Sequence, residues 1–345
     1  MNHRLRPLDR ILAAGTRAVT ALPEPLLATV ARPPVNSAGE RLDADVAVSL
    51  RLLRLIGGGR GMTRGGLARG RRELERQARL AAGRRIPARV RGTRIAGVPV
   101  REYLPRHAEP RGTVVLLHGG GWAMGSPDSH DAPARRLADG AGARVVSVDY
   151  RLAPEHPHPA ALDDAWAVYA ALAADPAAGP VAVAGDSAGA TLAAAVCLRA
   201  RDRRLPQPAL QALVAPVVDL VGRGASRVEF ARGFFLHDAD LEWFYRARLG
   251  AGPAAADPAD PEVSPLRAGD LRGLAPAYVA VAGFDPLRDE GLAYAGRLAA
   301  AGVPVAVVRH RGLVHPFLNS TGIWRGARRA VDQLAGALRL ALAGA

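Results

Sequence analysis

The sequence lacks several features that are typical of disulfide-bonded proteins and of membrane-spanning proteins. It has one cysteine, Cys197, so no disulfide can form within the chain. This residue follows a serine-containing turn by ten positions in an apolar stretch, which predicts a packed helix face rather than a nucleophile. No uncharged apolar run reaches the roughly 18 residues that a membrane-spanning helix needs. With 345 residues, 49% of them hydrophobic, the chain is long enough for one large core.

Lysine is absent, and all 46 basic residues are arginine. With 32 acidic residues the net charge is +14, an excess that can indicate nucleic-acid binding. The arginines, however, are scattered over the whole chain and accompany abundant alanine, which is typical of GC-rich codon usage. We therefore expect no nucleic-acid partner, and the charge leaves open only a weak attraction to anionic lipid surfaces.

The beginning of the chain predicts an amphipathic helix rather than a secretory signal. Residues 1–10 are basic, but the apolar run that follows is interrupted by Arg17 and lacks a persuasive cleavage site. The expectation is a cytoplasmic protein without stable membrane insertion.

A turn that can present a nucleophile occupies residues 185–189, Gly-Asp-Ser-Ala-Gly. The apolar run 180–184 before it is typical of a buried strand, and an apolar helical stretch follows. In a G-x-S-x-G turn, the two glycines leave room for a sharp change of direction that exposes the serine oxygen. Ser187 is therefore the candidate nucleophile.

A second glycine-rich segment follows another predicted strand, 113–117. It reads His118-Gly-Gly-Gly-Trp122, and three successive glycines leave backbone N–H groups free to converge on one oxygen atom. An oxyanion hole needs such donors, and the N–H of Ala188 is expected to add one more. The alternatives are a simple turn or a phosphate cradle, but no phosphate-binding glycine motif accompanies the segment.

A serine hydroxyl also needs a base, and the base needs an acidic partner. Asp285 ends the predicted strand 277–284, and His315 lies in the loop after the next strand. The order serine, aspartate, histidine is that of the α/β-hydrolase triad. Asp289 and His310 are the competing residues, which we place respectively on a solvated helical turn and at a strand edge.

The remaining histidines predict no metal site. His3, His107 and His237 have no partner signal, His130 begins a predicted helix, and His156 and His158 lie in a proline-rich loop. His118 is expected to brace the glycine loop by hydrogen bonding. Without clustered ligands, the sequence predicts neither a metal nor an organic cofactor.

Four motifs in order carry a family resemblance. They are 118–122 (HGGGW), 150–155 (YRLAPE), 185–189 (GDSAG) and 285–290 (DPLRDE). Together they resemble the hormone-sensitive-lipase-like branch of the α/β-hydrolases, the bacterial carboxylesterases of that group. The resemblance covers about 88–340. It departs from the family at Pro316, where glycine often follows the histidine.

This resemblance implies a fold and an activity. It implies a serine carboxylesterase acting on short- to medium-chain acyl esters, with Ser187, Asp285 and His315 as the triad. The oxyanion hole would comprise Gly120, Gly121 and Ala188 as donors, with Gly119 shaping the loop. Amide hydrolysis, acyl transfer by the same serine, and a non-catalytic small-ligand receptor remain the alternatives. A homodimer through the last strand and helix is also left open.

The remaining pattern predicts an α/β fold with a mostly parallel sheet of about eight strands and an antiparallel pair at its start. Residues 1–87 are expected to form a helical cap segment, with the glycines at 57–59 as a linker. Residues 88–345 form the catalytic domain, with a cap insertion at about 221–255 that holds many of the aromatic residues. Arg151 and Glu155 are expected to pair beneath the active site. The predicted strands are 89–95, 99–104, 113–118, 144–149, 180–185, 210–217, 277–284 and 303–309, and the predicted helices of the sheet domain are 129–140, 160–174, 188–203, 287–301 and 323–343.

Overall fold

The computed structural model describes residues 7–55, 61–106 and 109–344. The predicted glycine linker at 57–59 and His107 lie outside the described residues. No helix within these ranges is long and apolar enough to cross a membrane.

One eight-stranded sheet organises the molecule, in the order β1-β2-β4-β3-β5-β6-β7-β8. The first two junctions of this order, β1 with β2 and β2 with β4, are antiparallel, and all later ones are parallel. The predicted α/β fold is therefore confirmed. The strands are β1 (Arg89–Ile95), β2 (Val98–Leu104), β3 (Thr113–Leu117), β4 (Arg144–Val148), β5 (Val181–Asp186), β6 (Gln211–Val214), β7 (Ala277–Phe284) and β8 (Val305–Val314).

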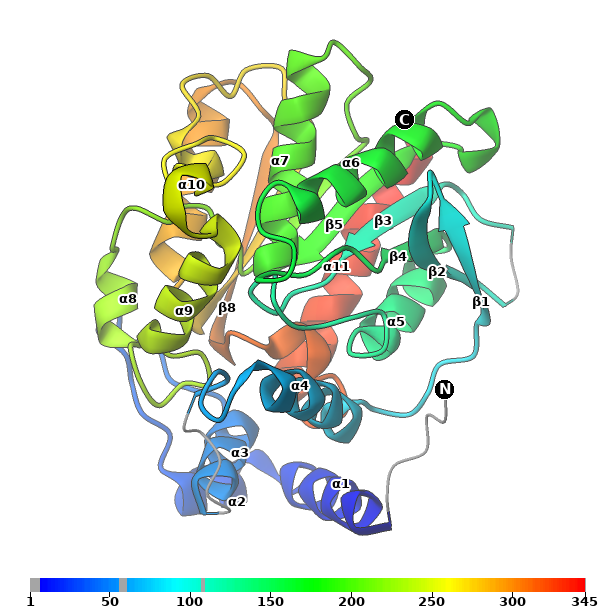
Figure 1. Cartoon of the computed structure of the whole chain (residues 1–345). Coiled ribbons are helices and arrows are strands. Elements are labelled where there is room, and N and C mark those ends of the chain that lie inside the picture. Colours follow the sequence, from blue (N-terminus) through cyan, green and yellow to red (C-terminus); the bar gives the residue numbers. More distant parts are fainter. Residues whose placement is uncertain (1–6, 56–60, 107–108, 345) are drawn as a thin grey trace.

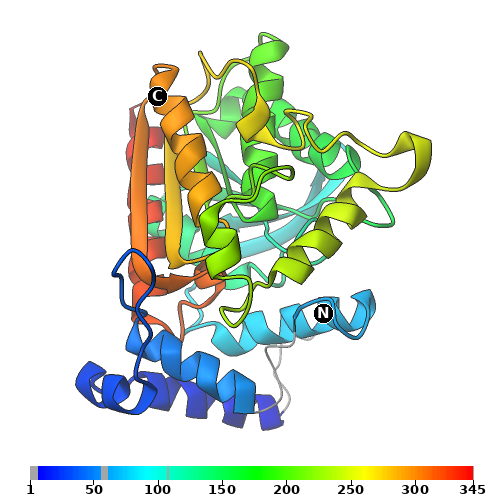
Figure 2. The same ribbon diagram turned by 90° about the vertical axis from the view of Figure 1, so that its left-hand side faces the viewer.

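Helices cover both faces of the sheet (Figures 1 and 2). On one face lie α6 (Ala160–Ala173), α7 (Ala188–Asp202) and α10 (Arg288–Ala300), and on the other lie α5 (Asp131–Ala141) and α11 (Arg325–Ala343). Along β5, Val183 faces the first layer, while Ala182 and Ala184 face the second. Burial on both faces explains why this strand is apolar at successive positions rather than alternating.

Two strands differ in length from the sequence expectation. We expected 210–217 for β6, but the strand ends at Val214 because Ala215 takes a left-handed conformation with φ 44°. We expected 303–309 for β8, but it continues to Val314, which pairs with Phe284 beyond an irregularity in β7. The polar residues of this extension hid its strand character in the sequence.

Within 7–55 and 61–88, four helices precede the sheet: α1 (Pro7–Thr20), α2 (Glu24–Ala31), α3 (Ala44–Leu55) and α4 (Leu67–Ala81). The first three form a layer at the bottom of Figures 1 and 2, and α4 lies between them and the sheet with its covering helices. An insertion after β6 adds α8 (Ala225–Glu229) and α9 (Asp238–Leu249). Both α4 and α9 contribute side chains to the cavity above Ser187.

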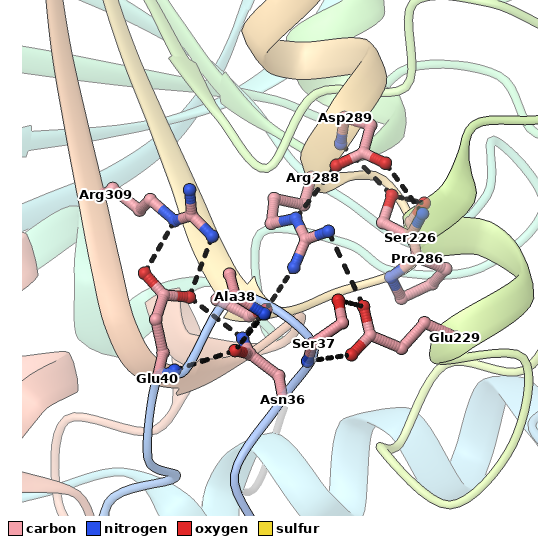
Figure 3. A network of polar contacts seen from close by, with 11 residues as sticks. Asn36, Ser37, Ala38, Glu40, Ser226, Glu229, Pro286, Arg288, Asp289 and Arg309 are labelled. Atoms are coloured by element: carbon pink, nitrogen blue, oxygen red, sulfur yellow. Dashed lines mark hydrogen bonds and ion pairs between the residues drawn. The ribbon is translucent and has the colours of Figure 1, made fainter.

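Polar contacts fix the segment between α2 and α3 to the sheet domain (Figure 3). The side-chain amide of Asn36 donates to the carbonyl of Gly283 at 3.1 Å. Arg309 of β8 pairs with Glu40 at 2.8 Å. The hydroxyl of Ser37 donates to Glu229 of α8 at 2.7 Å. These contacts hold the N-terminal helices and the insertion against the same end of the sheet.

Two helical glycines provide a matched test of the strand-to-helix turn. A Cβ at Gly189 would overlap the carbonyl oxygen of Leu117, whereas a Cβ at Gly296, inside α10, meets nothing within 4 Å. We expect Gly189→Ala to lower the free energy of unfolding by about 3 kcal/mol. Gly296→Ala should raise it by about 0.5–1 kcal/mol, since alanine favours the helix. Urea unfolding followed by tryptophan fluorescence measures the free energy of unfolding of both variants. Equal changes in the two variants would contradict the steric crowding proposed at Gly189.

Candidate active site

Ser187 lies at the turn between β5 and α7 in a strained conformation. Its φ is 55° and its ψ is −120°, in the left-handed half of the backbone map that L-residues seldom occupy. Its backbone N–H donates to the carbonyl of Val214 at 2.8 Å, which ties the turn to β6. A Cβ at Gly185 would overlap the backbone of Gly189. Both glycines of the motif are therefore needed for the turn to close.

The structure brings the three predicted side chains into one hydrogen-bonded chain. Nε2 of His315 lies 2.9 Å from Oγ of Ser187, and Nδ1 of His315 lies 3.0 Å from Oδ2 of Asp285. Asp285 is fully buried at the end of β7, where its Oδ1 also accepts the N–H of Leu287 at 2.9 Å. This arrangement fixes both the position of the imidazole and the nitrogen that faces the serine.

The environment of His315 favours its protonated form. Burial by itself would lower the pKa of His315, but the negative charge of Asp285 and the hydrogen bond to it outweigh burial. The pKa therefore lies above the ordinary value of histidine. Such an imidazole can accept a proton at little cost, as a general base must.

The glycine loop lies beside Ser187 and needs its glycines. Gly120 and Gly121 have φ values of 122° and 61°, and a Cβ at Gly121 would overlap the ring of Phe244. In the described part of the chain, no acceptor takes the N–H groups of Gly120 and Gly121. The N–H of Gly119 is different, because it donates to Oδ1 of Asp186 at 3.0 Å. Gly119 therefore shapes the loop and is not a free donor.

Buried aromatic and basic side chains support this loop from below. The imidazole of His118 stacks on Tyr150 with ring centroids 4.1 Å apart, and its Nδ1 lies 2.9 Å from the carbonyl oxygen of Gly119. Burial and the nearby His130 lower the pKa of His118 to about 3, so the ring is neutral. The guanidinium of Arg248 lies 4.1 Å from the centroid of Trp122. His118 thus braces the loop as expected.

Sequence reasoning missed a second polar cluster beside the triad. Nε2 of His130 lies 3.0 Å from Oδ1 of Asp186, and its Nδ1 lies 2.9 Å from Oγ of Ser129. Burial would raise the pKa of Asp186, but the charge of His130 and its hydrogen bond outweigh that effect and lower it. The side-chain amide of Asn319 completes the cluster, 3.2 Å from His130. The x position of the G-x-S-x-G turn was the only sequence signal for it.

The competing residues lie elsewhere. Asp289 accepts a hydrogen bond from the N–H of Ser226 at 2.7 Å and one from Arg288 at 2.9 Å (Figure 3). The ring of His310 packs against Phe317 with centroids 5.2 Å apart. Neither side chain contacts the serine, so the choice of Asp285 and His315 over them agrees with the structure.

The expected pairing of Arg151 with Glu155 is wrong. Arg151 instead pairs with Asp164 of α6 at 2.8 Å, and Glu155 pairs with Arg71 of α4 at 2.7 Å. The two side chains face different parts of the molecule, since Arg151 reaches a helix that covers the sheet and Glu155 reaches the N-terminal helices. Glu155 therefore fixes α4 over the loop.

The cavity at Ser187 is small. Its volume is about 50 Å³, and it is walled by apolar side chains from α4, α9 and the loop after β6. Leu241 and Phe244 of α9 are 2% exposed each, so they form a fixed wall rather than a mobile rim. Its apolar lining includes Met62, Leu74, Val217, Leu236, Leu241 and Phe244.

Comparison with known proteins agrees with this geometry. A family model described as the α/β-hydrolase fold matches residues 114–319. This span holds the glycine loop, the serine turn, Asp285 and His315, and it makes up more than half of the chain. The chain belongs to the hormone-sensitive-lipase-like α/β-hydrolases. Proteins named as esterases or ester hydrolases are among the relatives and solved structures that resemble this chain.

Two curated relatives and one solved structure illustrate these similarities. The carboxylic ester hydrolase LipN of Mycobacterium tuberculosis is 44% identical over 254 residues, which span 70% of this chain and 66% of the relative. An ethyl acetate hydrolase of Pseudomonas putida is 38% identical over 251 residues, spanning 70% and 78%. An ester hydrolase from the metagenome of Lake Arreo, solved with a derivative of bipyridine phosphonate, superposes with a TM-score of 0.79 at 36% identity, covering 87% of this chain and 98% of that one.

The raised pKa of His315 can be measured directly. We expect Asp285→Asn to lower the pKa of His315, because burial is then opposed only by the weaker effect of the Asp186 charge. The imidazole proton signals of His315, followed by NMR through a pH titration, report the change. Asp289→Asn removes the same charge from a residue that does not contact His315 and should leave the titration unchanged. A wild-type titration below the ordinary pKa would contradict the interpretation.

Proposed function

We propose that this carboxylic ester hydrolase uses Ser187 as its nucleophile, His315 as general base and Asp285 as the group that orients and stabilises the imidazole. The observation that carries the proposal is the continuous chain of hydrogen bonds from Ser187 through His315 to Asp285, at 2.9 and 3.0 Å. As the serine oxygen attacks the acyl carbon, His315 takes its proton and later gives that proton to the leaving alcohol. Water then repeats the attack on the acyl-enzyme.

The same proposal assigns the oxyanion hole to the N–H groups of Gly120, Gly121 and Ala188. Ala188 is the first residue of α7, so its N–H has no partner within the helix. This N–H also lies at the positive end of the helix dipole. Negative charge on the carbonyl oxygen develops only during the reaction, and donors fixed beforehand stabilise it without reorganisation. Gly119 supports the loop through Asp186.

We further infer that the acyl pocket accepts short acyl chains, at the lower end of the predicted short- to medium-chain range. A cavity of about 50 Å³ with fixed walls leaves room for little more than a small acyl group. The relative from Pseudomonas putida, named an ethyl acetate hydrolase, supports this inference. The mechanism itself needs no metal or organic cofactor, because side chains and backbone amides supply every group. A cytoplasmic location and a homodimer remain predictions from the sequence.

The assignment of Ser187 and His315 is tested by hydrolysis of p-nitrophenyl esters. We expect Ser187→Ala and His315→Ala each to lower kcat by roughly 10⁴-fold or more. The double variant should be no worse than either single variant, since the two side chains act as one unit. Thermal unfolding and circular dichroism identify a variant that has lost activity by failing to fold. A folded Ser187→Ala variant with near-normal activity would refute the mechanism, and wild-type inactivity on all esters would refute the esterase assignment.

The pocket wall is tested by Leu241→Ala with p-nitrophenyl acetate and hexanoate. Removal of three carbon atoms next to the acyl cavity should raise the ratio of kcat/KM for hexanoate over acetate by about tenfold. Leu298→Ala is the matched control, because Leu298 of α10 is equally buried but packs into the core away from the cavity. The control should lose stability without changing the ratio. An unchanged ratio in Leu241→Ala would exclude α9 as the determinant of acyl length.

A further inference from the structure

A second and much larger cavity lies outside the active site. It has a volume of about 850 Å³ and lies between α1, the end of α4 with the chain that follows it, the start of α5 and the chain before α11. Among the described residues that line it, seven are arginines, and the acidic ones are Asp128 and Asp131. We call it the arginine cleft. The catalytic cavity is separate, although His130 and Asn319 of that cavity are neighbours of cleft residues in the sequence.

Three of the seven arginines are neutralised by carboxylates. The pairs are Arg135 with Asp131 at 2.8 Å, Arg136 with Asp332 at 2.7 Å, and Arg79 with Glu75 at 3.6 Å. Arg135 is only 4% exposed, so this cation is a built part of the wall. Asp128, the other acidic residue of the lining, pairs with Arg101 outside the cleft at 2.6 Å. The carboxylates that line the cleft are therefore already paired with other arginines.

Four arginines of the cleft have no carboxylate partner within the described residues. Arg328 donates to the carbonyl of Thr321 at 3.3 Å. Across the same ranges, the guanidinium groups of Arg17, Arg84 and Arg85 form neither a hydrogen bond nor an ion pair. Like charges gathered around one cavity repel each other, and a bound anion relieves that repulsion.

The positive lining continues beyond the cleft. A neighbouring hollow of about 510 Å³ shares Arg85 and Arg135 with the cleft, and it adds Arg89 and Arg106. Within the described part of the chain, no acidic residue lines this hollow. The free cations are therefore spread along a groove rather than gathered at one point, which suits a ligand with several separated negative charges.

The geometry of α5 adds to the attraction. Asp131 and Ala132, in the first turn of this 11-residue helix, line the cleft, and among the described residues no acceptor takes the N–H of Ala132, whereas the N–H of Asp131 donates to Asp128 at 3.5 Å. The charge of Asp131 is offset by Arg135. Arginine and helix N-termini are both groups that bind phosphate oxygens well, arginine through two parallel N–H donors.

We propose that the arginine cleft binds a ligand carrying two or more phosphate groups. Two sources offer this chemistry. One is a ligand free in solution, and the other is the headgroup of a lipid, since α1 supplies Arg17 to the cleft and also exposes Leu8 and Ile11 at 66% and 69%. The phosphate chemistry is the same for both sources. The proposal concerns a site away from Ser187 and does not depend on the esterase mechanism.

The test uses inorganic tripolyphosphate as the probe and isothermal titration calorimetry as the measurement, with the full-length protein in about 50 mM salt. We expect Arg17→Gln/Arg84→Gln/Arg85→Gln to raise Kd at least about tenfold, which corresponds to about 1.4 kcal/mol. The matched control, Arg232→Gln/Arg246→Gln/Arg339→Gln, removes the same charge from exposed arginines outside the cleft and should keep the wild-type Kd. Absence of binding, or equal loss in both triple variants, would overturn the proposal.

Two further measurements complete the experiment. Hydrolysis of p-nitrophenyl acetate by the cleft variant should stay at the wild-type rate, and the exposed single variant Arg84→Gln gives a second reading of Kd if the triple variant unfolds. Sedimentation with vesicles of phosphatidylcholine, with and without phosphatidylinositol bisphosphate, separates the sources. Sedimentation that requires the phosphorylated lipid and is lost in the cleft variant assigns a headgroup. Tripolyphosphate binding without sedimentation assigns a soluble ligand.

Discussion

The close crossing of β5 and α7 is the constraint on which the site depends. Gly185 and Gly189 allow the strand and the helix to approach within a distance that no Cβ would permit, and Ser187 takes a positive φ as a result. The strain at the serine is held by the buried sheet on one side and by α7 on the other, since the parallel strands are covered on both faces. With the serine fixed there, the other groups have to come from strand ends at the same edge of the sheet.

Other parallel strands of the sheet supply those groups, because parallel strands end at the same edge of the sheet. β3 leads into the glycine loop, β7 ends at Asp285, and β8 ends just before His315. The buried aspartate balances the cost of burying the imidazole, which is why the pKa of His315 is raised although its surroundings exclude water. A rigid edge and one buried charge thus produce both the geometry and the basicity of the site.

The sequence could predict the parts of the site that arise from local chemistry. Ser187 and the glycine loop follow apolar strands in recognisable patterns, and Asp285 and His315 follow at strand ends. Contacts between distant elements were harder to predict. The extension of β8 to Val314 depends on pairing with Phe284, and the partners of Arg151 and Glu155 depend on how α6 and α4 dock. The cluster of His130 with Asp186 joins residues 56 positions apart and had no pattern of its own.

The unpaired arginines are a second feature that depends on contacts between distant elements and that the sequence alone does not predict. Along the chain the arginines look uniformly scattered, and a uniform scatter predicts no binding face. In the folded chain many arginines form ion pairs with carboxylates, as Arg136 does with Asp332 and Arg71 with Glu155, and these are not available to a ligand. Binding of an anion therefore depends on the arginines that have no carboxylate partner, and several of these lie where α1, the 82–87 segment and α5 meet. Net charge describes the whole molecule, but only the pairing pattern of the folded chain can locate a charge that is still available to a ligand.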